Sequence, residues 1–212
     1  MSNFLQKILK PFVSNETKAK WQQAAIEQIL QEWNDKGRPA PAPHSHKQQV
    51  IAGYQKLHNI NVLVETGTFM GDMVEAQKNN FKKIISIELS EQLFEKARQR
   101  FAGDARISIV QGDSGRVLHG IMKDLNQPAI FWLDGHYSAG ATARGDKDCP
   151  IFEEVDAIFA GADLPHVLLV DDARLFIGTG DYPTVEELTA YIQQKNAQYK
   201  VEVKDDVIRY SI

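Results

Sequence analysis

The sequence has little cysteine, no long apolar run and no excess of basic charge. Cys149 is the single cysteine among 212 residues, which excludes an intramolecular disulfide and a multi-cysteine zinc site. The 24 basic and 28 acidic residues give a formal net charge of -4. We therefore expect no nucleic-acid partner, since such proteins usually carry a basic footprint. No apolar run could span a bilayer and the start lacks a signal-peptide core, which predicts a cytoplasmic protein without a transmembrane segment.

The chain divides into an N-terminal helical region, residues 1–46, and a longer β/α region, residues 47–212. The N-terminal region ends in a proline-rich connector over residues 37–46. We expect its helices to pack on the core or to cover a ligand, with adsorption of the first one to a membrane surface as the alternative. His44 and His46 would be solvated in an extended connector, so we expect neither to bind a metal.

Five apolar runs alternate with helical patterns in the β/α region. The runs cover residues 61–65, 83–88, 106–111, 129–134 and 166–171, and the helical patterns after them begin near Gly71, Ser90, Ser114, Cys149 and Tyr182. This alternation predicts an α/β protein whose parallel strands are joined by right-handed crossovers. The tail has two alternating segments around Asp205-Asp206, which predicts a hairpin and an antiparallel last strand.

The first apolar run ends in an acid and two glycines. Val62-Leu63-Val64 fits a strand buried on both faces. Gly67 and Gly71 allow the chain to turn sharply and to pass close to a ligand. A dinucleotide fingerprint would place glycine where Phe69 stands, so a pyrophosphate and a nicotinamide-dependent oxidoreductase are disfavoured. Glu65 suits a cationic or hydroxyl-rich ligand, and the segment predicts a small-molecule site.

Polar residues also follow the second and third runs. Glu88 stands about twenty residues beyond the first glycine, the position of a carboxylate that accepts hydrogen bonds from ribose hydroxyls. Asp113 could accept a hydrogen bond from an adenine amino group, and Ser114 could cap the next helix. Each residue alone could be a helix cap or a solvated loop acid. Together they indicate a nucleoside bound across the ends of successive strands.

This ordered set resembles the class I S-adenosylmethionine-dependent methyltransferases over roughly residues 47–212. Glu65-x-Gly67-x-x-x-Gly71 matches the first motif of that family, Glu88 its ribose acid and Asp113-Ser114 its adenine-side motif. The resemblance implies a doubly wound, mainly parallel, Rossmann-like sheet of seven strands with the last one reversed, and S-adenosylmethionine as cofactor. The cofactor-binding residues that it implies are Glu65, Thr66, Gly67, Thr68, Phe69, Gly71, Asp72, Glu88, Leu89, Asp113, Ser114 and Asp134.

Carboxylates end the fourth and fifth runs. Asp134 and the Asp171-Asp172 pair are expected to face one cleft, where they would repel one another unless a cation neutralised them. Oxygen ligands suit Mg²⁺. The pattern is similar to the metal-dependent O-methyltransferases of the catechol and natural-product sugar types, which implies Asp134, Asp171 and Asp172 as metal ligands. The alternative is that they are ordinary strand-end acids.

His136 follows two residues after Asp134, and its neutral imidazole could accept the substrate proton. We therefore predict catalytic roles for His136 and Asp134. The polar loop 137–148 contains glycine and is expected to close over the substrate. Arg144 and Lys147 could meet an anionic group there.

These observations predict Mg²⁺-assisted O-methylation of a small hydroxylated acceptor, such as a sugar or a secondary metabolite. One alternative is a metal-independent methyltransferase that uses His136 as base. Another is a nucleoside-binding or scaffold protein without chemistry. The sequence leaves a homodimer open, because no motif in it reports the oligomeric state.

Overall fold

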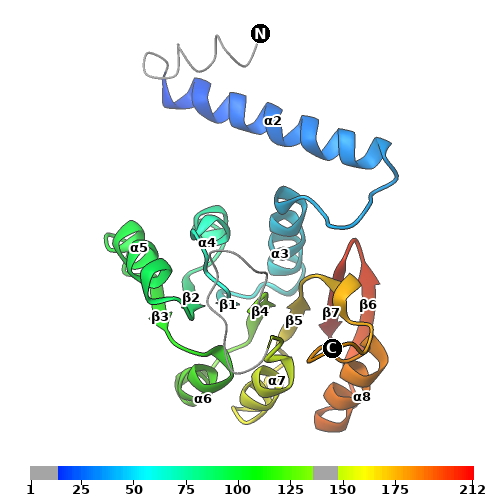
Figure 1. Ribbon diagram of the computed structural model, residues 1–212. Coiled ribbons are helices and arrows are strands. Elements are labelled where there is room, and N and C mark those ends of the chain that lie inside the picture. The colour runs from blue at the N-terminus through cyan, green and yellow to red at the C-terminus, as the bar shows by residue number, and fades with distance from the viewer. Residues whose placement is uncertain (1–13, 136–147) are drawn as a thin grey trace.

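The computed structural model describes residues 14–135 and 148–212, which form a seven-stranded sheet between two layers of helices (Figure 1). The strands are β1 (Val62–Thr66), β2 (Lys83–Glu88), β3 (Ile107–Gln111), β4 (Ala129–Leu133), β5 (Val167–Val170), β6 (Lys200–Lys204) and β7 (Val207–Ser211). Their order is β3-β2-β1-β4-β5-β7-β6. Strands β1 to β5 are parallel, whereas β7 runs antiparallel to both of its neighbours. The predicted sheet with a reversed last strand is confirmed.

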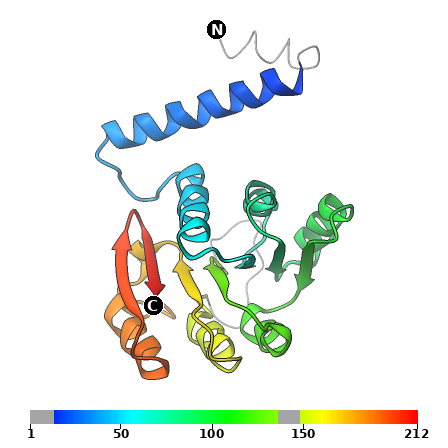
Figure 2. The ribbon, with the colours of Figure 1, turned by 180° about the vertical axis from the view of Figure 1, so that it is seen from behind.

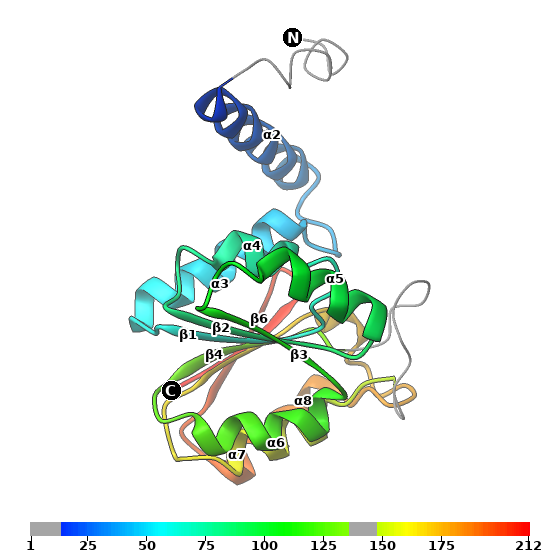
Figure 3. The same cartoon turned by 90° about the vertical axis from the view of Figure 1, so that its left-hand side faces the viewer.

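Helices α3, α4 and α5 cover one face of the sheet, and α6, α7 and α8 cover the other (Figure 3). The helices are α2 (Asn15–Asp35), α3 (His44–His58), α4 (Asp72–Gln77), α5 (Glu91–Phe101), α6 (Ser114–Asp124), α7 (Ile151–Phe159) and α8 (Val185–Lys195), with a short 3-10 helix, η2 (Ala173–Leu175). This is the doubly wound arrangement that alternating strands and helices predict.

Two apolar cores follow from the alternation of side chains along each strand. In β1, Leu63 packs on the side of α3 and α4, whereas Val62 and Val64 pack on the side of α6 and α7. All three residues are buried, as expected of a strand that is covered on both faces.

Helix α2 stands apart from the sheet, above α3 (Figures 1 and 2). Its last turn is fixed by Trp33, which is buried, lies against the His46 ring and donates through Nε1 to the carbonyl of Pro39 at 2.8 Å. No helix among the described residues is long and apolar enough to cross a membrane. The first helical pattern, within residues 1–13, lies outside the described residues.

The proline-rich connector is shorter than predicted, because α3 begins at His44 directly after Pro43. Pro43 is the N-cap, and its carbonyl accepts from the amides of His46 at 2.8 Å and Lys47 at 3.2 Å, the first hydrogen bonds of the helix. His44 and His46 therefore belong to the first turn of α3 and not to an extended connector. His46 Nε2 lies 3.1 Å from Oδ2 of Asp205, and burial lowers its pKa despite that carboxylate.

The C-terminal hairpin turns at Asp205 and Asp206, as predicted. Both residues have positive φ, 54° and 63°, which is the conformation that a two-residue hairpin turn of the right twist requires. The turn packs against the start of α3 through Asp205, so the last two strands contact the helix that precedes the first one.

Candidate active site

The carboxyl ends of β1, β2, β4 and β5 meet at one edge of the sheet, where open α/β sheets bind ligands. Thr66 pairs with Leu133, and Leu133 pairs with Val170, so the residues after these strands are neighbours. The amide of Asp134 donates to Oγ1 of Thr66 at 3.2 Å, and the amide of Asp171 donates to the carbonyl of Leu133 at 3.0 Å. The structure thus brings the acids predicted after β4 and β5 to the same edge.

The loop after β1 passes directly over the end of β4. Gly67 has φ 86°, and a Cβ there would overlap with the carbonyl oxygen of Asp134. Gly71 has φ 79°, and its Cβ would lie 2.7 Å from the Phe101 ring. Both glycines are therefore required by close approach as well as by backbone conformation. Phe69 between them has φ 49° with its side chain half exposed, a strained conformation that is often found at functional sites.

Glu65 lies beneath this loop with 2% of its surface exposed. Its carboxyl group accepts a hydrogen bond from the Ser86 hydroxyl, which also lies 2.6 Å from the hydroxyl of Thr68. Burial raises the pKa of Glu65 to about 8, although the bond from Ser86 opposes the rise. Glu65 supports the loop from below, and its direct contact with a cationic or hydroxyl-rich ligand stays a prediction.

Glu88, at the end of β2, holds the same loop from the side. Its Oε2 accepts from the amide of Phe69 at 2.7 Å, and its Oε1 accepts from the amide of Ser90 at 2.9 Å. Each carboxylate oxygen can accept a second hydrogen bond. The group is therefore fixed by two backbone donors and still able to accept from ribose hydroxyls.

The start of α6 differs from the prediction, because Asp113 and not Ser114 is its N-cap. The Asp113 carboxylate accepts from the amide of Arg116 at 3.3 Å. Ser114 instead donates from its hydroxyl to Oε1 of Glu154 at 2.6 Å. Both side chains could fill the cap, and the buried carboxylate on α7 draws the serine away from it. Asp113 keeps free lone pairs for an adenine amino group.

The two remaining residues of the predicted cofactor set, Asp72 and Leu89, each contact a neighbouring element. Asp72, largely exposed in the first turn of α4, lies 2.7 Å from the Arg100 guanidinium, which also donates to the carbonyl of Met70 at 2.6 Å. The carbonyl of Leu89 accepts from the side-chain Nε2 of Gln111 at 3.1 Å. Arg100 thus fastens the second half of the loop to α5.

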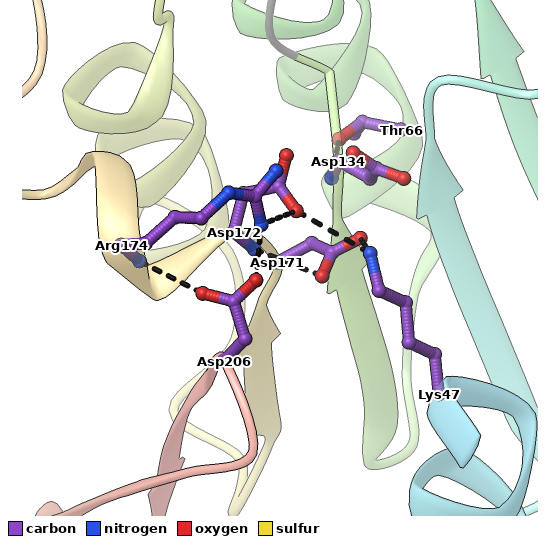
Figure 4. A network of polar contacts seen from close by, with 7 residues as sticks. All are labelled: Lys47, Thr66, Asp134, Asp171, Asp172, Arg174 and Asp206. Atoms are coloured by element: carbon purple, nitrogen blue, oxygen red, sulfur yellow. Dashed lines mark hydrogen bonds and ion pairs between the residues drawn. The ribbon is translucent and has the colours of Figure 1, made fainter. Parts of the chain in front are cut away.

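A lysine lies among the acidic residues that follow β4 and β5 (Figure 4). Lys47, in the first turn of α3, places its Nζ 2.5 Å from Oδ2 of Asp171 and 3.3 Å from Oδ1 of Asp172. Burial lowers the pKa of Lys47, but the neighbouring carboxylates outweigh this and the net shift is upward. Burial raises the pKa of Asp171, and Lys47 opposes that rise. We assign the pair as an ammonium and a carboxylate, because each charge has a hydrogen-bonded partner.

Arg174 and Asp206 extend this network. The Arg174 guanidinium lies 2.7 Å from Oδ1 of Asp172 and forms an ion pair with Asp206 of the hairpin turn. Asp172 itself has φ 56° and donates its amide to Oδ1 of Asp171 at 2.8 Å. None of Lys47, Arg174 and Asp206 was predicted as a site residue from the sequence. The only signal was indirect, since two adjacent acids after a buried strand require nearby cations.

The arrangement does not fit the predicted magnesium site. Across residues 14–135 and 148–212, no group of three or more His, Cys, Asp or Glu side chains is placed to hold a metal ion. The Lys47 ammonium already contacts two of the three predicted ligands, Asp171 and Asp172, and it would repel a divalent cation at that distance.

Several predicted residues lie outside the described part of the chain: His136, Arg144, Lys147 and the loop between them. Just after this segment, the amide of Asp148 donates to Oδ2 of Asp181 at 2.8 Å. Cys149 is buried, and burial raises the pKa of its thiol to about 12. A thiol that stays protonated is a poor nucleophile, so Cys149 is a packing residue.

A hollow of about 530 Å³ lies at the opposite edge of the sheet, near the amino ends of β4 and β5. It is lined partly by His166, Lys195 and Gln198. His166 accepts from the amide of Ala129 at 3.1 Å, and burial lowers its pKa to about 4. We place the functional site at the carboxyl edge, because ligands of open α/β sheets bind there.

No protein-family model matches the chain, and no curated protein matches it. Solved structures do match over almost its whole length. The O-methyltransferase TomG from Streptomyces achromogenes, involved in tomaymycin synthesis and bound to SAM (S-adenosylmethionine), is 15% identical; the match covers 89% of this chain and 88% of TomG, with a TM-score of 0.58.

Two further structures contain SAH (S-adenosylhomocysteine). The O-methyltransferase from Bacillus cereus is 13% identical over 98% of this chain and 96% of its own, with a TM-score of 0.57. The methyltransferase PaMTH1 from Podospora anserina is 16% identical over 94% of this chain and 97% of its own, with a TM-score of 0.55. At these identities the likeness concerns architecture: the chain has the Rossmann-like fold of class I methyltransferases.

Proposed function

We propose that this protein is an S-adenosylmethionine-dependent methyltransferase that methylates an oxygen atom of a small hydroxylated acceptor, such as a sugar or a secondary metabolite. The observation that carries the proposal is the pairing of Glu88 with the glycine loop. A carboxylate at the end of β2 accepts from the amide of Phe69, two residues after Gly67, where a Cβ would overlap with the carbonyl oxygen of Asp134. Structures of similar fold hold S-adenosylmethionine or S-adenosylhomocysteine.

The donor would lie across the ends of β1, β2 and β3. Glu88 would accept hydrogen bonds from the ribose hydroxyls, and Asp113 would accept one from the adenine amino group. The absence of a side chain at Gly67 would let the methionine part pass close to the backbone. Seven further residues of the predicted set would line or support the same pocket: Thr66, Thr68, Phe69, Gly71, Asp72, Leu89 and Ser114.

The reaction is a displacement at the methyl carbon. A lone pair of the acceptor oxygen forms the new O–C bond, the C–S bond breaks, and its electron pair returns to sulfur to leave a neutral thioether. The hydroxyl proton must leave the oxygen, and we assign it to the Asp134 carboxylate or to His136 as general base. Both residues follow β4, whose end contacts the donor loop through Thr66 and Gly67.

Mg²⁺ held by Asp134, Asp171 and Asp172 would act as a Lewis acid that lowers the pKa of a bound hydroxyl. The position of Lys47 does not fit this ion, and the proposed reaction has no step that needs it. Magnesium-dependent transfer would require Lys47 to leave both carboxylates.

Calorimetric titrations with S-adenosylhomocysteine and NADH test the donor. Binding of S-adenosylhomocysteine alone supports the proposal, whereas binding of NADH alone refutes it. Transfer of labelled methyl groups to pools of hydroxylated metabolites then tests the chemistry. Tight donor binding without turnover on any pool would favour the scaffold alternative. Turnover that resists EDTA would exclude a metal-assisted step, and its loss in His136→Ala would identify His136 as the base.

A further inference from the structure

We propose that the ammonium group of Lys47 is the resident cation of the acceptor site, where it neutralises Asp171 and Asp172 and donates a hydrogen bond to the acceptor oxygen. The inference rests on the proposed function, because it assigns a role within the same reaction. In this proposal the Lys47 side chain takes the charge-neutralising role that the sequence predicted for a divalent ion.

The first support is the position of the lysine. Lys47 extends from the start of α3 to the carboxyl ends of β4 and β5 (Figure 4). Its side chain is 13% exposed, and that of Asp171 is 2% exposed. A buried carboxylate needs a hydrogen-bonded counter-charge, and Lys47 supplies it at the edge where ligands of this fold bind.

The second support is the number of donors. An ammonium group has three N–H donors, and two of them are used by Asp171 and Asp172. Among the described residues the lysine makes no third hydrogen bond. The remaining N–H is thus available to a ligand that enters the site.

The third support is that both carboxylates are themselves held in place. Asp171 accepts from the amide of Asp172 at 2.8 Å. Asp172 is held by Arg174, which pairs in turn with Asp206 of the β6–β7 turn. The ammonium is therefore fixed before any ligand arrives, and a preorganised donor stabilises developing negative charge better than a mobile one.

The position also suits the reaction. Asp134 lies near enough for its charge to favour the ammonium form of Lys47. A hydroxyl between them would receive an N–H bond from Lys47 while its proton passes to the Asp134 carboxylate. The oxygen lone pair then attacks the methyl carbon, and the C–S electron pair leaves with sulfur. Lys47 is not consumed and keeps its proton.

The test compares binding of Mn²⁺, an oxygen-preferring probe for Mg²⁺, by electron paramagnetic resonance. We expect the wild-type protein and the matched control Lys56→Met, an exposed lysine on the same helix, to bind no Mn²⁺ at millimolar concentration. We expect Lys47→Met to bind it at least tenfold more tightly, because Asp171 then lacks its cation and the ammonium no longer repels a metal ion from the site. Equal Mn²⁺ binding by wild type and Lys47→Met, lost in Asp171→Asn, would overturn the proposal.

A second variant separates folding from function, because Lys47→Met leaves Asp171 buried without a counter-charge. Lys47→Met/Asp171→Asn removes both charges, and we expect it to fold and to bind S-adenosylhomocysteine within about threefold of wild type. With an acceptor from the metabolite screen, its kcat in EDTA should fall at least a hundredfold. An unchanged kcat would overturn the role of Lys47, whereas failure of the wild type to bind S-adenosylhomocysteine would instead refute the proposed function.

Discussion

The Nζ of Lys47 lies 2.5 Å from Oδ2 of Asp171, although 124 positions of sequence separate the two residues. The contact joins the first turn of α3 to the carboxyl end of β5. The ion pair therefore lies at the edge of the sheet where, in the proposed reaction, the donor and the acceptor would bind. Because both side chains are largely buried, the pair also affects stability.

Lys47→Met should lower the free energy of unfolding by about 3 kcal/mol, because it leaves a buried carboxylate without its partner. Lys47→Met/Asp171→Asn should recover most of this loss. Urea denaturation measures both, with Lys56→Met as an exposed control expected within about 0.5 kcal/mol of wild type. Equal stability of Lys47→Met and wild type would show that the pair is not formed in solution.

Gly67→Ala should destabilise the protein by about 3 kcal/mol, because the new Cβ overlaps the Asp134 carbonyl and the backbone has positive φ. Gly53→Ala is the matched control. Gly53 lies within α3 with open space around it, so alanine there should stabilise by about 0.5–1 kcal/mol. Thermal unfolding of both variants measures the contrast. A Gly67→Ala protein as stable as wild type would contradict the described path of the loop.

Glu65 should make stability depend on pH between about 4.5 and 8. In the folded protein burial raises the pKa of Glu65 from 4.5 to about 8. Between these values the folded state holds a proton that the unfolded state has lost, so the free energy of unfolding falls as pH rises, by up to ~1.4 kcal/mol per pH unit. Glu65→Gln removes this contribution. Chemical denaturation from pH 5 to 8 should give a flatter profile for the variant, and identical profiles would show that Glu65 is ionised throughout.

Thr184→Ala should lower the free energy of unfolding by about 1 kcal/mol. Thr184 accepts from the amide of Glu187, and the Glu187 carboxylate accepts from the amide of Thr184, which forms a complete capping box at the start of α8. Thr189→Ser, which keeps a hydroxyl in the same helix, serves as the comparison in urea denaturation. A loss below about 0.3 kcal/mol would mean that the box does not form.

The architecture was predictable because each strand carries its own signal. The apolar runs, the glycines after β1 and the two acids of the C-terminal turn are local features, and local features set strand positions and turn types. The position of the site at one edge of the sheet was also predictable, because the carboxyl ends of parallel strands lie at the same edge.

The partners within that edge were not predictable from local patterns. Lys47 and Asp171 meet only after the whole sheet has formed, so no spacing in the sequence relates them. Ser114 and Asp113 could both cap α6, and the choice depends on Glu154, which lies 40 positions from Ser114 in sequence. In both cases the contact depends on a buried carboxylate that lies far away in the sequence: Asp171 for Lys47 and Glu154 for Ser114.

The most direct test of the proposed function is calorimetric titration of S-adenosylhomocysteine into wild type, Glu88→Gln and the exposed control Glu91→Gln. We predict that wild type and Glu91→Gln bind alike and that Glu88→Gln binds at least tenfold more weakly, a loss of about 1.4 kcal/mol, because the ribose hydroxyls and the amide of Phe69 lose a charged acceptor. Failure of the wild type to bind S-adenosylhomocysteine, or equal binding by Glu88→Gln, would contradict the proposed methyl-donor site.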